Sequence, residues 1–439
     1  MTTSPPAADA SAEPRFRVLV FPAGTELGLE IGRALAGAKE VALFSAGADV
    51  SSHAELAFVR HRAIPSVTDP GWLAALAKVV EAWSITHVCP AHDDVLLALA
   101  RNSDKSPARV VTSPLATCEI CRSKSSTYAH LRDVVAVPQT YAAADDVPAF
   151  PVFVKPDRGQ GSQHARRIDS RAALDVALTE SPERLISEFL PGAEYTVDCF
   201  SDRERGLLYA GPRERIRTRA GIAMHTTFVD DAELQAWAAR IAKRLTFHGA
   251  WFFQAKRNAA GALKLLEVAP RPAGASSLTR ARGVNLPLLS LYEAERVPVS
   301  LLPNAGNLQL DRSLANRYRH DFEYDTVYVD LDDTLLFRGA VHPPLVAFLY
   351  QCLNRGIRLI LLTRHRAAIA DTLAKHRLQS LFDEVIPLPR DARKSGLITV
   401  KGAIFIDDSF AERREVAEAC GIPTFDLSML ELLLDDRAS

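Results

Sequence analysis

Short apolar runs alternate with helical patterns at both ends of this chain, and this alternation constrains the fold more than any other feature. Near the amino end the runs are Arg17–Phe21, Glu40–Phe44 and Thr86–Cys89. A second series of the same kind begins at Thr326 and continues to the end of the sequence. Strands that alternate with helices form parallel sheets. The sequence therefore predicts an α/β domain at each end.

The stretch between these two series has a different texture. From about residue 113, a helix over Lys124–Leu131 and a strand over Val152–Lys155 are followed by strands and helices without regular alternation. This pattern is typical of an α+β domain. The polar segment 302–325 suits a linker. The predicted fold class is therefore α/β and α+β multidomain. Its expected parts are a disordered leader over 1–14, a Rossmann-like domain over 15–112, an α+β domain over 113–305, a linker over 306–324 and an α/β domain over 325–439.

Composition excludes several classes of protein. At 439 residues the chain is too long for one hydrophobic core, and its net charge of −1 gives no support for a polyanion-binding surface. We therefore expect no nucleic-acid partner. No stretch approaches the ~20 apolar residues that a membrane-spanning helix needs, so no membrane partner is expected. Of six cysteines only Cys118 and Cys121 are close, and we interpret them as buried helix positions. The expected location is cytoplasmic, and a homo-oligomer is left open.

Two carboxylates follow the first strand of the carboxyl-terminal series. Asp330 and Asp332 come directly after the apolar run 326–329. Residues two apart in an extended chain point the same way, and the carboxyl ends of strands are where open α/β sheets place their chemistry. Two such carboxylates can hold Mg²⁺ and divide the nucleophile and acid/base duties between them. This pattern predicts a site that handles phosphoryl groups.

Five polar features follow one another in the middle domain. A Gly-rich turn lets backbone N–H groups approach phosphate oxygens, and flanking lysines offset their charge. Carboxylate and amide oxygens suit Mg²⁺, and an arginine can steady a transferring phosphoryl group. In chain order the features are Lys124; Lys155 with the turn Gly159-Gln160-Gly161-Ser162; Glu188-Phe189-Leu190 with Glu194; Gln254; and Glu267 with Arg271. Each one alone is more often a solvated surface residue, so the order of the set carries the prediction.

With these features in this order, residues 15–310 resemble the ATP-grasp superfamily, especially the carbamoyl phosphate synthetase large-chain branch and its carboxylate–amine ligase relatives. The resemblance implies a Rossmann-like pre-ATP-grasp domain followed by an ATP-grasp domain, with ATP between two subdomains. Backbone near 186–190 would read adenine and Glu194 would hold the ribose. Gln254 and Glu267 would bind Mg²⁺, with Mn²⁺ as an alternative, and Arg271 would lie near the reacting phosphate. The implied nucleotide contacts are Lys124, Lys155, Gly159, Gly161, Ser162, Glu188, Phe189, Leu190 and Glu194.

One position departs from the pattern of that superfamily. An asparagine usually stands two residues after the metal-binding glutamate, and here the residue is Ala269. Mg²⁺ commonly keeps several waters, so the loss of one neutral ligand need not abolish binding. It does weaken the expectation of a second metal ion and of full ligase activity.

A run of arginines precedes Gly221 in the same domain. Arg213, Arg215, Arg217 and Arg219 stand at every second position. Guanidinium groups bind carboxylates and phosphates well, so the run can form an anion clamp for a substrate. A solvated mobile loop is an equally good interpretation of a charge run.

Four pieces of the carboxyl-terminal series form a more specific set. They are Asp330 with Asp332, Thr363 after an apolar strand, Lys394, and the pair Asp407-Asp408 after another apolar strand. Residues 325–430 thereby resemble the haloacid dehalogenase superfamily, with a minimal cap because the stretches between motifs are short. The resemblance implies that Asp330 is the nucleophile and that Asp332 is the general acid and base. Thr363 and Lys394 would hold the phosphoryl oxygens, and Asp330, Asp332 and one of Asp407 and Asp408 would bind Mg²⁺.

The two resemblances together predict a bifunctional enzyme that uses ATP and Mg²⁺. One half would ligate a small-molecule carboxylate to an amine-type nucleophile through an acyl phosphate. The other half would hydrolyse a phosphate ester through an aspartyl phosphate. One alternative is a phosphatase whose ATP-grasp part only binds nucleotide, as a sensor or scaffold. A non-enzymatic assembly module is a third, less favoured, interpretation.

Overall fold

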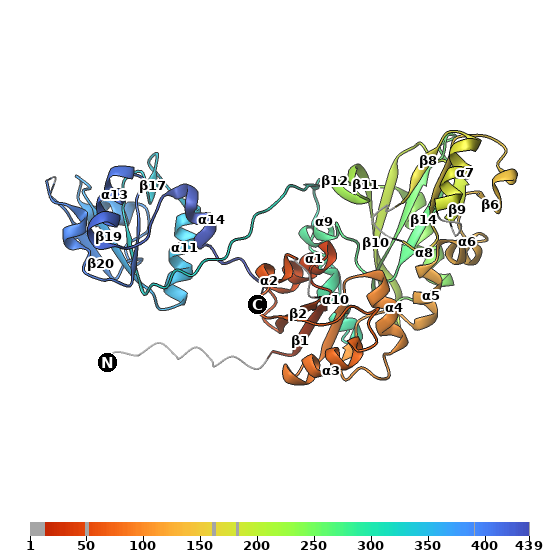
Figure 1. The fold of residues 1–439 in the computed structure, drawn as a ribbon, viewed down its shortest axis with the longest axis horizontal. Coiled ribbons are helices and arrows are strands. Elements are labelled where there is room, and N and C mark those ends of the chain that lie inside the picture. Colours follow the sequence, from red (N-terminus) through yellow and green to blue (C-terminus); the bar gives the residue numbers. More distant parts are fainter. Residues whose placement is uncertain (1–13, 49–51, 160–163, 181–183, 390, 439) are drawn as a thin grey trace. The chain divides into compact units, whose positions relative to one another are not determined.

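The computed structural model describes residues 14–48, 52–159, 164–180, 184–389 and 391–438. The chain divides into two compact units (Figure 1). The larger unit is Met1–Ala315 with Arg437–Ser439, and the smaller unit is Asn316–Asp436. Within the described ranges, no helix combines the length and the apolar character that crossing a bilayer would require.

The amino-terminal part of the larger unit is a parallel sheet with strand order β3-β2-β1-β4-β5. Both faces of the sheet are buried, since Phe16, Val18 and Val20 join one hydrophobic cluster while Leu19 and Phe21 join another. This explains why its strands are apolar runs without polar alternation. The strands are β1 Phe16–Phe21, β2 Val41–Gly47, β3 His61–Ala63, β4 His87–Pro90 and β5 Arg109–Val110, and the helices are α1 Glu26–Leu35, α2 Ala54–Ala57, α3 Trp72–Ala82 and α4 Asp93–Arg101.

Two antiparallel sheets make up the rest of the larger unit. A four-stranded sheet has the order β6-β9-β7-β8, and a six-stranded sheet has the order β14-β13-β10-β11-β12-β15. The first comprises β6 Thr140–Tyr141, β7 Val152–Pro156, β8 Arg166–Ile168 and β9 Arg184–Glu188. The second comprises β10 Glu194–Asp202, β11 Gly206–Arg219, β12 Ile222–Phe228, β13 Gly249–Arg257, β14 Leu263–Ala269 and β15 Gln309–Asp311. The helices are α5 Leu115–Arg122, α6 Lys124–Leu131, α7 Arg171–Glu180, α8 Ala232–Arg244, α9 Ser277–Ala281 and α10 Leu286–Ala294.

Helices join these sheets into one body. The apolar stripe of α8, with Leu234, Trp237 and Ile241, packs on the six-stranded sheet. Leu291 of α10 packs into the cluster beneath the parallel sheet. The expected domains 15–112 and 113–305 therefore share buried surface and form one compact unit.

The structure corrects two of the expected boundaries. Gln309–Asp311, inside the expected linker 306–324, is strand β15 and pairs with β12. Ala438, inside the expected domain 325–439, pairs with Phe58 of the larger unit. The Ala438 amide donates to the Ala57 carbonyl at 2.8 Å, and its side chain is buried in the same cluster as Phe58. Edge pairing of this kind depends on backbone groups, which composition does not reveal.

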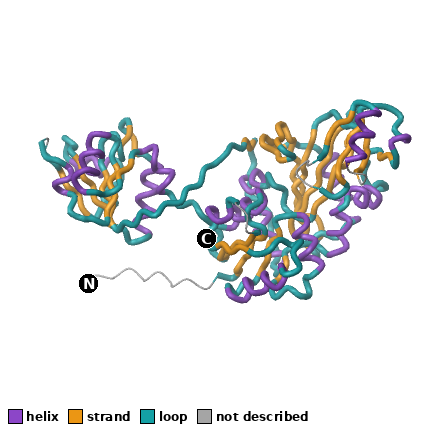
Figure 2. Tube along the Cα trace, in the orientation of Figure 1, coloured by secondary structure: helices purple, strands orange, loops and turns teal. Residues whose placement is uncertain are grey.

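The smaller unit is a parallel sheet with strand order β20-β19-β16-β21-β22. Alternate residues of β19 and β21 join two different clusters, so helices cover both faces (Figure 2). A two-stranded hairpin, β17–β18, follows the first strand. The strands are β16 Thr326–Val329, β17 Leu336–Phe337, β18 Ala340–Val341, β19 Arg358–Thr363, β20 Glu384–Pro387, β21 Ala403–Ile406 and β22 Thr424–Phe425, and the helices are α11 Pro343–Asn354, α12 Ile369–Lys375, α13 Phe410–Cys420 and α14 Leu430–Leu433.

Candidate functional site

The nucleotide site expected in the larger unit begins with two opposed residues on β13 and β14. Gln254 and Glu267 are direct partners in this antiparallel pair, and a bulge follows between Gln254 and Ala255. Directly opposite residues in an antiparallel pair project to the same face of the sheet. The amide and the carboxylate therefore face one space, as a shared Mg²⁺ would require.

Lys155 at the end of β7 is buried, although it carries a charge. Its Nζ donates to Tyr128 Oη at 2.8 Å and lies 5.3 Å from the centre of that ring. Burial, together with the nearby charge of Lys124, lowers the pKa of Lys155 to about 8, although Glu267 and Glu194 oppose the shift. Within the part of the chain that the structure describes, no carboxylate is in hydrogen-bonding contact with this ammonium group, and a buried cation in that situation is costly. Lys155 is therefore well suited to bind an anionic ligand, whose negative charge would compensate the buried ammonium group.

Asp157 connects the two expected phosphate-binding lysines. Its carboxylate accepts hydrogen bonds from Ser123 Oγ and from the Ser125 amide, both at 2.7 Å, and so caps the start of α6. Lys124, the first residue of that helix, places its Nζ 3.4 Å from the carbonyl oxygens of Asp157 and Gly159. The amino end of α6 is thereby tied to the turn that follows β7.

Glu194 sits in a network of cations at the start of β10. Arg215 Nε lies 2.9 Å from Glu194 Oε1, and Lys256 Nζ lies 3.3 Å from Glu194 Oε2. Arg215 also donates to the Gly221 carbonyl at 2.6 Å, which holds the β11–β12 turn close to this carboxylate. A carboxylate has four lone-pair positions, so Glu194 can still accept ribose hydroxyls.

These residues line one cavity. Glu188 is partly occupied elsewhere, because its carboxylate accepts a hydrogen bond from the Gln139 amide at 2.9 Å. Gly161 and Ser162 lie outside the described residues. The predicted nucleotide-binding residues that line this cavity are Lys124, Lys155, Gly159, Glu188, Phe189, Leu190 and Glu194, and the predicted metal ligands that line it are Gln254 and Glu267.

A second cavity adjoins the first across Gln254 and Glu267, which line both. The expected phosphate-binding Arg271 lines this second cavity and is held by Asp93 through two hydrogen bonds of 2.6 and 2.8 Å. Burial raises the pKa of Asp93, but the charge and hydrogen bonds of Arg271 outweigh burial and leave this pKa below its usual value. Arg271 is therefore fixed in place by the start of α4.

The arginine run is part of a strand. Arg213, Arg215, Arg217 and Arg219 belong to β11, so the interpretation as a mobile loop is wrong. Arg213 is 1% exposed and donates to both carboxylate oxygens of Asp198. Arg217 pairs with Asp311 at 2.5 Å. Of the four, Arg213 and Arg215 line the second cavity. The interpretation of the run as an anion clamp stays a prediction.

Ala269 lies among apolar neighbours. It is buried in a small cluster with Phe252 and Ala273 and stands opposite Phe252 on β13. These side chains offer no oxygen to a second metal ion.

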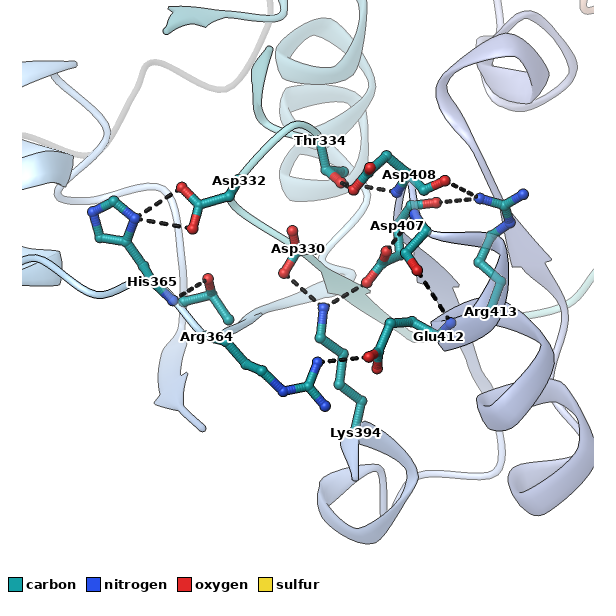
Figure 3. Close-up of polar contacts among 12 residues, drawn as sticks. Asp330, Asp332, Thr334, Arg364, His365, Lys394, Asp407, Asp408, Glu412 and Arg413 are labelled. Carbon is teal, nitrogen blue, oxygen red and sulfur yellow. Dashed lines mark hydrogen bonds and ion pairs between the residues drawn. The ribbon is translucent and has the colours of Figure 1, made fainter. Parts of the chain in front are cut away.

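The smaller unit gathers its charged residues at the carboxyl edge of its sheet (Figure 3). Asp330 follows β16, and Asp407 follows the neighbouring strand β21. Lys394 Nζ lies between them, 2.7 Å from Asp330 Oδ1 and 2.5 Å from Asp407 Oδ2. All three side chains are buried. Burial raises the pKa of Asp330 to about 6, which Lys394 opposes and Asp407 reinforces.

The remaining expected residues occupy different places. Thr363 is buried at the end of β19, and its Oγ1 accepts the His365 amide at 3.1 Å. The Asp332 carboxylate contacts His365 and does not join Lys394. Asp408 is exposed, and its Oδ1 accepts a hydrogen bond from Thr334 Oγ1 at 3.1 Å. The structure therefore distinguishes Asp407 from Asp408, since of these two aspartates it is Asp407 that contacts Lys394.

The expected metal set, Asp330 and Asp332 with one of Asp407 and Asp408, is not assembled by side chains. Among the described residues, no group of three His, Cys, Asp or Glu side chains is arranged to hold a metal ion. Two buried carboxylates, Asp330 and Asp407, face a single ammonium group and leave one negative charge uncompensated. Mg²⁺ often binds through one or two carboxylates and keeps its waters. This pair fits Mg²⁺, whereas the side chains of Asp332 and Asp408 do not contribute in the present arrangement.

Comparisons with known proteins concern the larger unit. Residues 180–309 match a family model described as ATP-grasp in the biosynthetic pathway with Ter operon. The larger unit contains an ATP-grasp domain. A search of curated proteins found no match. The resemblance of residues 325–430 to the haloacid dehalogenase superfamily stays a prediction.

Solved structures with the same fold as the ATP-grasp unit have low sequence identity. N5-carboxyaminoimidazole ribonucleotide synthetase from Thermus thermophilus is 15% identical with a TM-score of 0.55, covering 67% of this chain and 82% of its own. The biotin carboxylase domain of Hydrogenobacter thermophilus 2-oxoglutarate carboxylase, solved with MgADP, ADP and bicarbonate, is 14% identical (TM-score 0.52, 64% and 69%). The L-amino acid ligase from Bacillus licheniformis is 15% identical (TM-score 0.50, 64% and 75%). Likeness at this level concerns the fold alone.

Several site residues escaped the sequence-based reasoning. Asp157 stands two residues after Lys155, just before the Gly-rich turn. Lys256 and Gln254 share one face of β13, because residues two apart in a strand point the same way. His365 stands two residues after Thr363, beyond the end of β19. Alternation along a strand was therefore a usable signal for Lys256 alone, whereas the roles of Asp157 and His365 required the structure.

Proposed function

We propose that the ATP-grasp unit is an ATP-dependent ligase that activates a carboxylate for attack by an amine-type nucleophile. The observation that carries this proposal is the opposed pair Gln254 and Glu267 at the boundary of two cavities. One cavity is lined by Lys124 and Lys155, which suit nucleotide phosphates. The other is lined by Arg271, with Arg215 shared between the two cavities, and suits a small anionic acceptor.

In the proposed reaction, ATP occupies the first cavity and the substrate carboxylate occupies the second. A substrate carboxylate oxygen in the second cavity attacks the γ-phosphorus of ATP, and ADP leaves. The amine nitrogen then attacks the acyl carbon and loses a proton to solvent, and phosphate departs with the former carboxylate oxygen. Lys124 and Lys155 offset the phosphate charge, Arg271 steadies the transferring group, and Gln254 with Glu267 would hold Mg²⁺. The solved relatives that bind MgADP with bicarbonate, or are named as amino acid ligases, support this assignment.

Acceptor-dependent ADP formation tests the ligase proposal. We expect a panel of amino acids and other carboxylates, offered in pairs with ATP and Mg²⁺, to contain a combination that stimulates ADP release. Glu267→Ala should lower that stimulated rate by about 100-fold or more, because the metal loses its one anionic ligand from these strands. Glu233→Ala, an exposed position on α8, is the matched control and should change nothing. Stimulation that is unaffected by Glu267→Ala would contradict the assignment.

The apolar surroundings of Ala269 favour a second candidate function for the same unit. Without an oxygen ligand at this position, the unit would bind nucleotide as a sensor or scaffold and not turn it over. ATP binding measured by calorimetry, together with no acceptor-dependent ADP formation across the panel, would support this alternative.

We further propose that the smaller unit is a Mg²⁺-dependent phosphatase. Asp330 attacks phosphorus, the ester P–O bond breaks, and Asp332 donates its proton to the leaving oxygen. Asp332 then takes a proton from water, which attacks the aspartyl phosphate and releases phosphate and the free Asp330. Thr363 and Lys394 hold phosphoryl oxygens, and Asp330 with Asp407 would bind the metal. Two phosphoryl sites on one chain suit consecutive steps on one metabolite.

Metal removal tests the charge argument at Asp330 and Asp407. We expect chelation by EDTA to lower hydrolysis of a phosphate monoester by about 100-fold or more, because one buried carboxylate charge is then uncompensated. Added Mg²⁺ should restore the rate, and Mn²⁺ should also do so, whereas the larger Ca²⁺ should restore little. Full activity after chelation would contradict this proposal.

A further inference from the structure

Asp332, the expected general acid and base of the smaller unit, is hydrogen-bonded to a histidine. His365 Nδ1 lies 2.8 Å from Asp332 Oδ1 and 3.0 Å from Asp332 Oδ2 (Figure 3). Because both carboxylate oxygens of Asp332 lie within hydrogen-bonding distance of Nδ1, the carboxylate accepts a hydrogen bond from the Nδ1–H of the ring. Neither residue belongs to the buried group of Lys394, Asp330 and Asp407.

His365 is itself held on its other sides. Its Nε2 lies 2.8 Å from Thr372 Oγ1 on α12, and its amide donates to Thr363 Oγ1. The hydroxyl of Thr372 can donate to Nε2, which leaves the ring proton on Nδ1. The His365 side chain is 16% exposed, whereas that of Asp332 is 53% exposed. A mostly buried and anchored ring therefore orients a half-exposed carboxylate that would otherwise sample several rotamers.

We propose that His365 is a positioning residue that aims Asp332 for proton transfer in the phosphatase reaction. This inference rests on the proposed phosphatase function. His365 keeps its Nδ1 proton throughout and exchanges none with the substrate. Asp332 alone gives a proton to the leaving oxygen and later takes one from water. By occupying one side of the carboxylate, the imidazole leaves the remaining lone pairs for the reacting atoms.

The dependence of the rate on the leaving group separates this role from a merely structural one. Proton donation matters greatly for an alkyl phosphate, whose leaving alkoxide is strongly basic, and little for p-nitrophenyl phosphate. The ratio kcat/KM reports the steps up to departure of the leaving group, so the later hydrolysis of the aspartyl phosphate does not enter. A positioning fault at Asp332 should therefore appear in kcat/KM for the alkyl ester alone.

The experiment compares both esters on the full-length protein with Mg²⁺. For His365→Ala we expect kcat/KM to fall by about 100-fold for the alkyl phosphate and by less than about 5-fold for p-nitrophenyl phosphate. His365→Asn places an amide N–H near the position of Nδ1 and should recover about tenfold of the alkyl loss. His376→Ala, another histidine at the end of α12, is the matched control and should behave as wild type.

Each outcome bears on the inference. Equal losses for the two esters, or no rescue by His365→Asn, would overturn the positioning role and leave the phosphatase proposal standing. Hydrolysis that is absent from wild type, or that survives Asp330→Asn, would overturn the phosphatase proposal and this inference with it. If His365→Ala does not fold, Thr372→Val keeps the imidazole and removes its outer partner. A loss of kcat/KM in Thr372→Val for the alkyl ester alone would then support the positioning role. Losses of the same size for the two esters, or no loss for either, would oppose it.

Discussion

Asp330→Asn is expected to lower phosphate release from p-nitrophenyl phosphate by at least about 10³-fold, because the substitution removes the attacking oxygen. The amide has nearly the same shape, so the fold of the smaller unit should persist. The variant also removes one of the two carboxylates that flank Lys394 and leaves the Asp407 contact in place. Continuous release of p-nitrophenolate in Mg²⁺ buffer measures the effect.

A control separates loss of the nucleophile from a general effect of removing an acid. Asp371→Asn lies in the first turn of α12, is exposed, and should retain the wild-type rate. Circular dichroism should show the same unfolding temperature for both variants to within a few degrees. Acceptor-dependent ADP formation should be unchanged in Asp330→Asn, because its site lies in the other unit. Phosphate release that survives Asp330→Asn would refute the assignment of the nucleophile.

Lys155→Met should abolish ATP-dependent turnover and, without nucleotide, stabilise the protein. The buried ammonium has a pKa lowered from 10.5 to about 8. Below about pH 8 the folded protein carries this charge at a cost, and the free energy of unfolding of wild type should rise as pH increases from 8 to 10.5. Methionine removes the cost, so at pH 7 the variant should gain about 1–3 kcal/mol. The advantage should shrink as pH approaches 10.5.

Addition of ATP should stabilise wild type more than Lys155→Met, which is the reverse of the difference expected without nucleotide. Wild type should gain stability in proportion to the logarithm of ATP concentration, because ligand binds the folded state. Lys155→Met should gain little, since the phosphates lose a buried cation. Thermal unfolding at pH 7 and pH 10, with and without MgATP, measures both effects. Lys243→Met, at an exposed site in the last turn of α8, should show neither effect. A lower unfolding temperature for Lys155→Met without nucleotide would contradict the argument.

The comparison of sequence and structure is most instructive at the two sites. The order Lys124, Lys155, Glu194, Gln254 and Glu267 was sufficient to predict residues that the structure brings to one cavity. Each stands at a strand end, a helix start or a strand position with recognisable periodicity. Lys394 and Asp330 likewise meet at 2.7 Å. Asp330 is predictable because the carboxyl ends of parallel strands gather at one edge of a sheet. The residues of the cavity in the larger unit come from a helix start and two antiparallel sheets, and there the order of the motifs carried the prediction.

Other features depended on partners that are distant along the chain. Arg271 was expected at the reacting phosphate, and the structure adds its bidentate partner Asp93, which is 178 positions away. Asp332 was expected beside Asp330 as a metal ligand, and its carboxylate instead contacts His365. Gln309–Asp311 was expected in a linker and is an edge strand. In each case a charged or backbone group had several potential partners of similar chemistry.

The amino-acid sequence by itself determined which elements form, because apolar periodicity and capping residues act over a few positions. It also determined which side chains of suitable chemistry stand at the ends of those elements. Only the tertiary structure decided how charges are paired, which of Asp407 and Asp408 meets Lys394, and which faces of the larger unit share a core. The physical reason is that ion pairs and edge-strand hydrogen bonds are short-range in space yet join residues far apart in sequence. Their selection depends on burial and geometry, which exist only once the chain has folded.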